Sequence, residues 1–294
     1  TMNAADAQHG VVYGMPAEQY HLTPAMSNSA LGALKRSPRH YWAEYLSPER
    51  PERDQTPAMF AGTLAHCAVL EADAMAARYI VVPEHAPRRP TAAQLAAKKP
   101  SIDSQAAMAW WSDFNAQASG RLIVTAEQYS TTRQQIAAVL AVPELAALLK
   151  DGRPEVSFFW MDPETGVHCK ARADHVHRLA DGRVILLDLK TTSDASPQQF
   201  GRSVWNFGYH RQDAWYSRGY ELASGDQVAA FVFGVVTSDY PFIAVPYLLD
   251  DAAKAMGTQE CRDLLATYAQ CKAADYWPAY GTGVQLLSLP AWAK

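Results

Sequence analysis

An aspartate and a lysine, Asp188 and Lys190, stand at the end of the apolar stretch ILLDLKTTS, residues 185–193. A continuous apolar run of this length is typical of a strand buried on both faces, where an unpaired charge costs several kcal/mol. Because side chains alternate across a strand, Asp188 and Lys190 point to one face and Leu189 to the other. The pair could serve a metal-dependent reaction at a phosphate, or it could be a plain ion pair on a surface hairpin.

A second carboxylate, Asp174, lies on the strand candidate that precedes this one. The turn signal ADG at 180–182 joins the two strands, and closing this hairpin can bring Asp174 near Asp188. Two carboxylates held close together repel each other unless a cation lies between them, and oxygen ligands suit Mg²⁺ or Mn²⁺. We therefore expect a divalent metal at the end of this hairpin.

Other residues could complete such a site, although each has an ordinary structural explanation. His66 lies in an apolar helix within GTLAH, where it could ligate a metal or be a core histidine. Gln212 and Tyr216 are four residues apart on a predicted helix and share one face, which is also typical of an aromatic stripe. Glu155 opens a strand and is either an extra carboxylate of the site or an exposed charge.

The elements that must position these residues form an α/β pattern in the second half of the chain. Turn signals DPETG and ADG separate three strand candidates. We predict strands at 155–161, 167–177 and 183–190, a helix at about 208–223, strands at about 228–237 and 241–248, and a last helix to about 275. This order predicts an α/β domain with helical elaboration on its N-terminal side.

The first half of the chain reads as mainly helical. Ser27–Ser29 can cap a helix running into Lys35 and Arg36, and Ser37 and Pro38 can start a second helix. Further along, we predict a polar connector at 48–57, a buried helix at 58–72, an exposed loop or mobile segment at 83–100, and helices at about 101–118 and 125–150. We expect a single domain over 1–294, with a helical part at 1–150, a catalytic core at 151–250 and a C-terminal helix and tail at 251–294.

The ordered motifs G-x-x-x-H, Asp, D-x-K and Q-x-x-x-Y resemble the PD-(D/E)xK nuclease superfamily, in particular its RecB-like branch and the RecE-type (exonuclease VIII) and phage exonucleases. The likeness extends over roughly residues 19–249 and includes SNSALGALKRSPRHYWAEYL, AMFAGTLAHCAVLE and EVSFFWMDPETGVHCKARADHVH. It implies a restriction-endonuclease-like core, a central mixed sheet flanked by helices. It also implies metal ligation by His66, Asp174, Asp188 and the Leu189 carbonyl, a catalytic Lys190, and Gln212 and Tyr216 near the scissile phosphate.

The same resemblance implies an activity and partners. The expected enzyme is a Mg²⁺- or Mn²⁺-dependent 5′→3′ exonuclease, with one or two ions, that resects linear double-stranded DNA. Its 3′ single strands would pass to an annealing protein of the RecT or beta type, and the enzyme would form a ring-shaped homo-oligomer, a trimer or tetramer. The first acid follows R-A rather than P, a departure from the motif that names the superfamily. The alternatives are a RecB-like endonuclease, a CRISPR-associated nuclease, or a catalytically inactive DNA-binding or assembly protein.

Charge and composition limit which partners, cellular location and bound groups the chain can have. The net charge of −4 does not indicate nucleic acid, so DNA contacts must come from local patches. Ten basic residues are candidates for such contacts: Lys35, Arg36, Arg39, Arg88, Arg89, Lys98, Lys99, Arg172, Arg202 and Arg211. The lack of a long apolar run or a signal-like start predicts a cytoplasmic protein without membrane contact. Some nucleases of the RecB-like branch hold an iron–sulfur cluster with one upstream and three closely spaced downstream cysteines. Of the four cysteines here, Cys67, Cys169, Cys261 and Cys271, the downstream Cys261 and Cys271 are too few and too far apart for that pattern, so we expect no iron–sulfur cluster. His175 and His177 should face away from Asp174.

Overall fold

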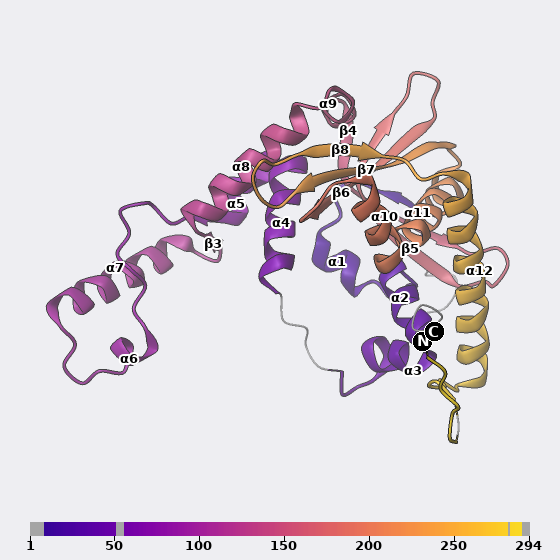
Figure 1. Ribbon diagram of the computed structural model, residues 1–294, viewed down its shortest axis with the longest axis horizontal. Coiled ribbons are helices and arrows are strands. Elements are labelled where there is room, and N and C mark those ends of the chain that lie inside the picture. Colours follow the sequence, from indigo (N-terminus) through magenta and orange to yellow (C-terminus); the bar gives the residue numbers. More distant parts are fainter. Residues whose placement is uncertain (1–8, 51–55, 282, 290–294) are drawn as a thin grey trace.

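A computed structural model describes residues 9–50, 56–281 and 283–289, so the middle of the predicted connector, 51–55, lies outside the described residues. A six-stranded mixed sheet forms the centre, with helices on both faces (Figure 1). This confirms the predicted α/β architecture. Three segments of the N-terminal half, which sequence patterns assigned only to helices and loops, also form strands.

The sheet has the order β1-β4-β5-β6-β7-β8. The strands of this sheet are β1 (Gly10–Val12), β4 (Gly152–Met161), β5 (His168–Arg178), β6 (Val184–Thr192), β7 (Val228–Thr237) and β8 (Ala244–Tyr247). β6 and β7 pair in parallel, whereas every other neighbouring pair is antiparallel. A parallel pair needs a crossover connection, and the helices between β6 and β7 provide it.

The helices cover both faces of this sheet, and most of them precede β4 in the chain. Those before the sheet core are α1 (Ala17–Leu22), α2 (Asn28–Arg36), α3 (Pro38–Tyr41), the π-helix η2 (Trp42–Leu46), α4 (Pro57–Leu70), the 3₁₀ helix η3 (Ala72–Ala74), α5 (Met75–Arg78), α6 (Ala92–Leu95), α7 (Ile102–Ala118), α8 (Ala126–Leu140) and α9 (Pro143–Lys150). Between β6 and β7 lie α10 (Pro197–Phe207) and α11 (Tyr209–Ser224), and α12 (Asp251–Ala274) follows β8. As predicted, Ser27 and Ser37 cap α2 and α3 through their side-chain oxygens.

Two apolar layers hold the sheet between these helices. One layer joins the sheet to α2, α11 and α12, with Trp160, Phe231 and Tyr220 among its buried side chains. The other packs Leu187 and Leu189 of β6 against α8 and α9. β6 is covered on both faces, which explains its run of apolar residues. A charged side chain on this strand is buried as well and therefore needs a partner.

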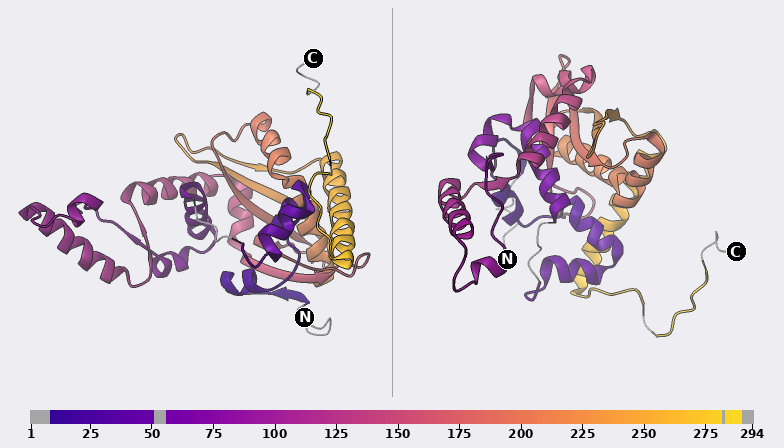
Figure 2. Two further views of the ribbon diagram at one scale, coloured as in Figure 1. Left: turned by 90° about the horizontal axis from the view of Figure 1, so that it is seen from below. Right: turned by 60° about the vertical axis from the view of Figure 1, so that its left-hand side comes forward.

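An arm of residues 83–121, which carries α6 and α7, projects from the body (Figures 1 and 2). A small parallel sheet of β2 (Tyr79–Val81) and β3 (Leu122–Val124) forms its base. Within the arm, the Trp111 indole donates to the Pro87 carbonyl at 2.9 Å, and the Arg89 guanidinium lies 4.7 Å from the Trp111 ring centre. The segment predicted as a loop at 83–100 is thus exposed, but it contains one helical turn and folds back against α7.

Other sequence predictions need correction at specific residues. The single helix predicted at 125–150 is two helices, because Pro143 cannot donate a backbone hydrogen bond and starts α9. The first strand of the meander begins at Gly152 rather than Glu155, and β8 covers only part of 241–248. α10 was not predicted. None of the described helices combines the length and the apolar composition that crossing a lipid bilayer requires.

A glycine on α12 allows close contact between α12 and α11. A β-carbon at Gly257 would lie 2.0 Å from the backbone carbonyl oxygen of His210, and a backbone atom cannot move aside as a side-chain tip can. We expect Gly257→Ala to lower the free energy of unfolding by about 1–3 kcal/mol. Gly201→Ala is the matched control, since Gly201 lies in α10 with open space around it and should change stability by less than about 1 kcal/mol. Denaturant unfolding measures both, and equal stabilities of the two variants would contradict the close contact.

Candidate active site

Asp188 and Lys190 lie side by side at the end of β6, with their side chains toward α11. The Lys190 ammonium is 2.6 Å from the Asp188 carboxylate, and the Gln212 side chain donates to the other carboxylate oxygen at 2.5 Å. Asp188 is only 3% exposed, so this is a buried pair and not an ion pair on a surface hairpin. Leu189, between them, packs in the opposite layer, as strand alternation predicts.

Tyr209 also belongs to this group, although sequence reasoning did not select it. Its ring centre is 4.5 Å from the Lys190 ammonium, which places the cation over the aromatic face. Tyr209 and Gln212 are three residues apart on α11 and therefore share a face. The same helical spacing that selected Gln212 and Tyr216 could have found it. Tyr216 lies further along, with its ring edge-on to Phe158.

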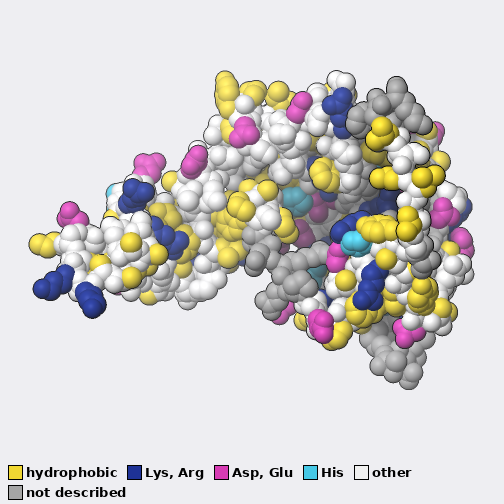
Figure 3. Space-filling view, turned by 60° about the horizontal axis from the view of Figure 1, so that its bottom comes forward, with side chains coloured by type: hydrophobic (Ala, Val, Ile, Leu, Met, Phe, Trp, Pro, Cys, Tyr) yellow, Lys and Arg dark blue, Asp and Glu magenta, His cyan; other side chains and the backbone are white. Residues whose placement is uncertain are grey.

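A second group of side chains gathers beside this pair. His66, Glu155 and Asp174 each offer a ligand atom, and the three atoms lie within 4.8 Å of one another; no other such group of three or more occurs in the described part of the chain. The β5–β6 register explains the position of Asp174, because pairing of His175 with Leu187 brings Asp174 opposite Asp188. Figure 3 shows acidic and histidine side chains at the floor of a hollow near the middle of this face.

The hydrogen bonds around His66 test whether a cation fits this group. The Nε2 atom of His66 is 2.8 Å from the Leu189 carbonyl oxygen, which can only accept, so Nε2 is the donor. The other ring nitrogen, Nδ1, then faces the Asp174 carboxylate at 3.3 Å. Two lone-pair atoms this close need a proton or a metal cation between them. The donor set of one imidazole and two carboxylates therefore fits a divalent metal.

The backbone at Glu155 is what turns this residue toward the group. Glu155 has a φ of 52°, in the left-handed region that non-glycine residues rarely adopt. It lies opposite Asp174 in the β4–β5 register, and the Arg172 guanidinium holds its carboxylate at 2.5 Å. Such strain persists only where surrounding contacts fix it, and it is frequent at functional sites. Glu155 lies inside β4, so it is not a charge at the start of a strand as the sequence suggested.

Burial and neighbouring charges shift the protonation of the site. Burial raises the pKa of Asp174 to about 7; His66 opposes this shift and Asp188 adds to it. Burial lowers the pKa of Lys190, but Asp188 and Asp174 outweigh burial and hold that pKa above its ordinary value. Burial raises the pKa of Tyr216 well above its ordinary value, so its hydroxyl stays protonated. The Lys190 ammonium can bind a negatively charged phosphate oxygen, and a cation held by the neighbouring carboxylates can do the same. The site is therefore suited to reactions of phosphates.

The predicted ligand set and the observed group share His66 and Asp174 and differ in their other members. Sequence and resemblance selected His66, Asp174, Asp188 and the Leu189 carbonyl. The structure brings Glu155 into the group with His66 and Asp174, and the Leu189 carbonyl borders it through His66. Asp188 lies next to the group but contacts Lys190 and Gln212. Metal ligation by Asp188 therefore remains a prediction.

The ten basic candidates for DNA contact occupy very different environments. Arg172 bonds Glu155 and the Met15 carbonyl, and Arg211 is buried against Glu260 and Asn28, so both guanidinium groups are engaged within the protein. Lys35 and Arg36 reach carboxylates at 2.8 and 3.0 Å but remain exposed, whereas Arg39 lies over a tryptophan ring. The exposed candidates away from these contacts are Arg88, Arg89, Lys98 and Lys99 on the arm and Arg202 on α10.

The remaining histidines and cysteines lie apart from the site residues. His175 is buried, and its ring packs against the backbone of Gly152. It and His177 are not in the metal-binding group. The four cysteines are buried free thiols.

Residues 27–290 match the family described as PDDEXK-like domain of unknown function (DUF3799). The chain belongs to this family. The match confirms the resemblance to the PD-(D/E)xK superfamily and, together with the mixed sheet, the predicted fold. A PDDEXK-like domain is a nuclease-type domain, and such nucleases generally use divalent metals, which the His66–Glu155–Asp174 group fits.

Solved structures also resemble this PDDEXK-like protein. A Eubacterium rectale protein provisionally named an exonuclease has 14% sequence identity and a TM-score of 0.53, with 86% of each chain covered. An alkaline exonuclease from Laribacter hongkongensis has 18% identity and a TM-score of 0.26, and the match covers 69% of this chain and 98% of that one. The first likeness supports the fold. None of the curated proteins matches the chain.

Proposed function

We propose that this PDDEXK-like protein is a Mg²⁺- or Mn²⁺-dependent exodeoxyribonuclease that degrades one strand of linear double-stranded DNA in the 5′→3′ direction. The observation that carries this proposal is the His66–Glu155–Asp174 group directly beside the buried Asp188–Lys190 pair. The polarity, the handover of 3′ single strands to an annealing protein and a ring-shaped oligomer are supported by the resemblance to RecE-type exonucleases.

The site residues would have different roles in phosphodiester hydrolysis. A divalent cation held by His66, Glu155 and Asp174 would supply Lewis acidity at the phosphate and make a nearby water more acidic. Lys190 keeps its positive charge beside Asp188 and can bind a phosphate oxygen whose negative charge grows during the reaction. Gln212 fixes the Asp188 carboxylate, which in turn fixes the direction of the lysine.

A digestion assay tests this function. Linear duplexes labelled at the 5′ or the 3′ end are incubated with the protein and Mg²⁺, and closed circular DNA of the same sequence is the control. Early release of the 5′ label as mononucleotides, with the circle intact, is the expected result. Early release of the 3′ label would overturn the polarity, and cutting of the circle would favour an endonuclease. Binding without any cleavage would favour an inactive DNA-binding protein.

The exposed basic patches give a prediction about DNA affinity. Neutralising Arg88, Arg89, Lys98 and Lys99 on the arm should weaken duplex binding and reduce the slope of log K against log[salt] by about 0.9 per lost phosphate contact. The same change at Lys35, Arg36 and Arg39 tests the second patch. Binding is measured in Ca²⁺ across a salt series. If neither variant changes affinity or slope, the path of the DNA does not run over these patches.

A further inference from the structure

Two large aromatic side chains stand exposed at the C-terminal end of α10. Phe200 and Val204 on its inner face are buried in the core, whereas Trp205 is 60% and Phe207 64% exposed. We call Trp205 and Phe207 the α10 platform. The sequence patterns did not predict α10, Trp205 and Phe207 were not among the expected site residues, and the proposed reaction does not use them.

The α10 platform adjoins the catalytic lysine. The Phe207 ring centre is 5.7 Å from that of Tyr209, and the Lys190 ammonium lies 4.5 Å from the centre of the same Tyr209 ring. Gly208 joins α10 to α11 with a φ of 69°, a left-handed turn that places the two aromatic residues on either side of it close together. One aromatic ring therefore separates the exposed Phe207 from Lys190.

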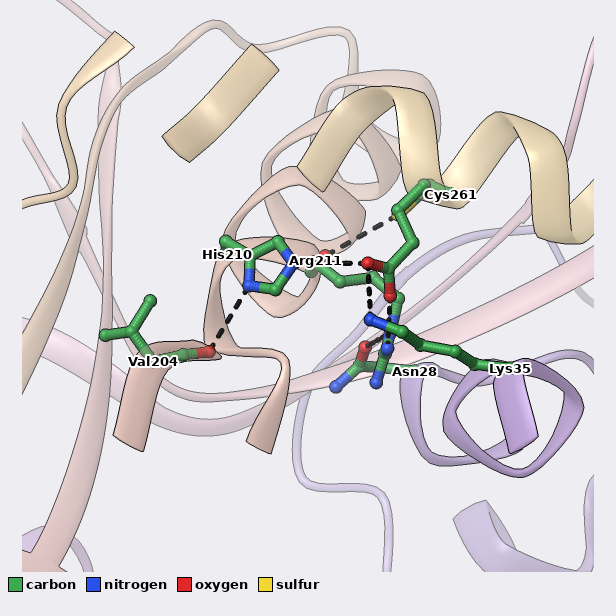
Figure 4. Close-up of polar contacts among 7 residues, drawn as sticks. Asn28, Lys35, Val204, His210, Arg211 and Cys261 are labelled. Carbon is green, nitrogen blue, oxygen red and sulfur yellow. Dashed lines mark hydrogen bonds and ion pairs between the residues drawn. The ribbon is translucent and has the colours of Figure 1, made fainter. Parts of the chain in front are cut away.

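Contacts behind Trp205 hold its ring in place. The Trp205 ring lies nearly parallel to the buried His210 ring, at 12° and a centre distance of 5.7 Å. His210 is bound on both sides, to the Val204 carbonyl and to Glu260, each at 3.2 Å (Figure 4). Glu260 also binds Arg211 at 2.6 Å. Burial raises the pKa of Glu260, but hydrogen bonds from Lys35, Arg211 and His210 outweigh burial and hold this pKa at about 2. The carboxylate therefore stays ionised, and the platform rests on a fixed, buried network.

Positive charges lie beside Trp205. The Lys35 ammonium, which Glu260 binds at 2.8 Å, is 5.4 Å from the Trp205 ring centre. Arg202 is exposed and lies three residues before Trp205, on the same face of α10. Exposed aromatic rings beside cations match the chemistry of single-stranded DNA, whose bases stack on rings while its phosphates bind cations.

We propose that the α10 platform stacks the bases of unpaired nucleotides at the end of the DNA strand that the active site cuts. This inference rests on the proposed nuclease function and names the form of DNA that the site prefers. Inside a duplex, both faces of a base are covered by its neighbours, so a protein ring can stack only on a terminal or unpaired base. A platform one ring away from Lys190 thus favours frayed or single-stranded ends over internal positions.

Binding of a defined DNA end tests the platform directly. The probe is a duplex with a short unpaired end carrying 2-aminopurine as its last base, in Ca²⁺. We expect Phe207→Ala to weaken binding roughly 5- to 100-fold and to relieve the quenching of 2-aminopurine fluorescence, since one base stack is lost. Phe207→Trp, which keeps a ring, should restore both. Tyr276→Ala is the matched control, because Tyr276 is 63% exposed but lies at the end of α12.

An abasic site in the same DNA makes the test independent of protein folding. Replacing the last base by an abasic sugar should weaken binding to the wild-type protein as much as Phe207→Ala does, with little further loss when the two changes are combined. Equal losses from the abasic site in wild type and variant would overturn the platform. So would a Phe207→Ala variant that binds and quenches like wild type while the wild type cleaves DNA in Mg²⁺. Failure of the wild type both to bind and to cleave would instead overturn the proposed function.

Discussion

Replacing Lys190 by methionine is expected to reduce DNA cleavage roughly 10²- to 10³-fold or more while the protein remains folded. The ammonium is the positive charge closest to the Asp188 carboxylate, and removing one such stabilising group from a phosphate or oxyanion site has effects of this size. Methionine retains most of the volume of the side chain, which preserves packing against Tyr209. Initial rates at saturating DNA and Mg²⁺ measure the loss.

Asp188→Asn tests the partner and should also abolish most of the activity. The amide removes the negative charge but keeps the shape of the side chain and an oxygen that can accept from Lys190. Asp188→Ala would remove the acceptor as well and could cost several kcal/mol of stability. Asp181→Asn is the control, because Asp181 is an exposed carboxylate, paired with Arg183, in the turn between β5 and β6. Near wild-type turnover in either site variant would show that the reaction takes place elsewhere.

Removing divalent metal is expected to abolish cleavage altogether. The carboxylates of Glu155 and Asp174 and the His66 ring converge; Arg172 pairs with Glu155, whereas Asp174 ionises only with difficulty in this setting. Mg²⁺ or Mn²⁺ should restore activity after chelation by EDTA. Ca²⁺ should bind without supporting turnover, because its larger and looser coordination sphere positions a water poorly. Full activity in excess EDTA would contradict the assignment.

A metal-binding measurement tests whether the His66–Glu155–Asp174 group, and not another carboxylate, binds the ion. Asp174→Asn should weaken Mn²⁺ binding at least about tenfold in calorimetric titration, since it removes a ligand and its charge. Asp226→Asn is the control, because Asp226 is paired with Arg178 on the surface. Unchanged Mn²⁺ affinity of the Asp174 variant would place the ion at a different site. Because this readout needs no DNA, it remains informative even if the reaction is not the one proposed.

Local sequence patterns predicted the part of the site that depends on strand and helix periodicity. Alternation along β6 put Asp188 and Lys190 on one face, and helical spacing put Gln212 and Tyr216 on one side of α11. The hairpin between β5 and β6 predicted that Asp174 approaches Asp188, which the register produces. These inferences needed only neighbours in the chain, so they did not depend on knowing the tertiary structure.

Charges were harder to place, because a sequence does not reveal which of them become buried. Arg172 and Arg211 were predicted to contact DNA, yet each forms an ion pair with a carboxylate, the first with Glu155 and the second with Glu260, 49 residues further along the chain. The exposed aromatic residues of α10 were missed because the sequence also does not reveal which apolar residues stay exposed. An apolar side chain in a sequence is expected to be buried, and only the packed helix shows that Trp205 and Phe207 are not.

The sequence by itself determined the superfamily resemblance, the α/β order and the residues at the end of β6, because ordered motifs and periodicity are properties of the chain. Tertiary structure alone decided that Glu155 joins His66 and Asp174, since this depends on a left-handed φ inside β4 and on pairing across the sheet. It also decided that Tyr209 lies against Lys190 and that the arm projects from the body. These features arise from contacts between segments far apart in sequence, whose energies no local pattern contains.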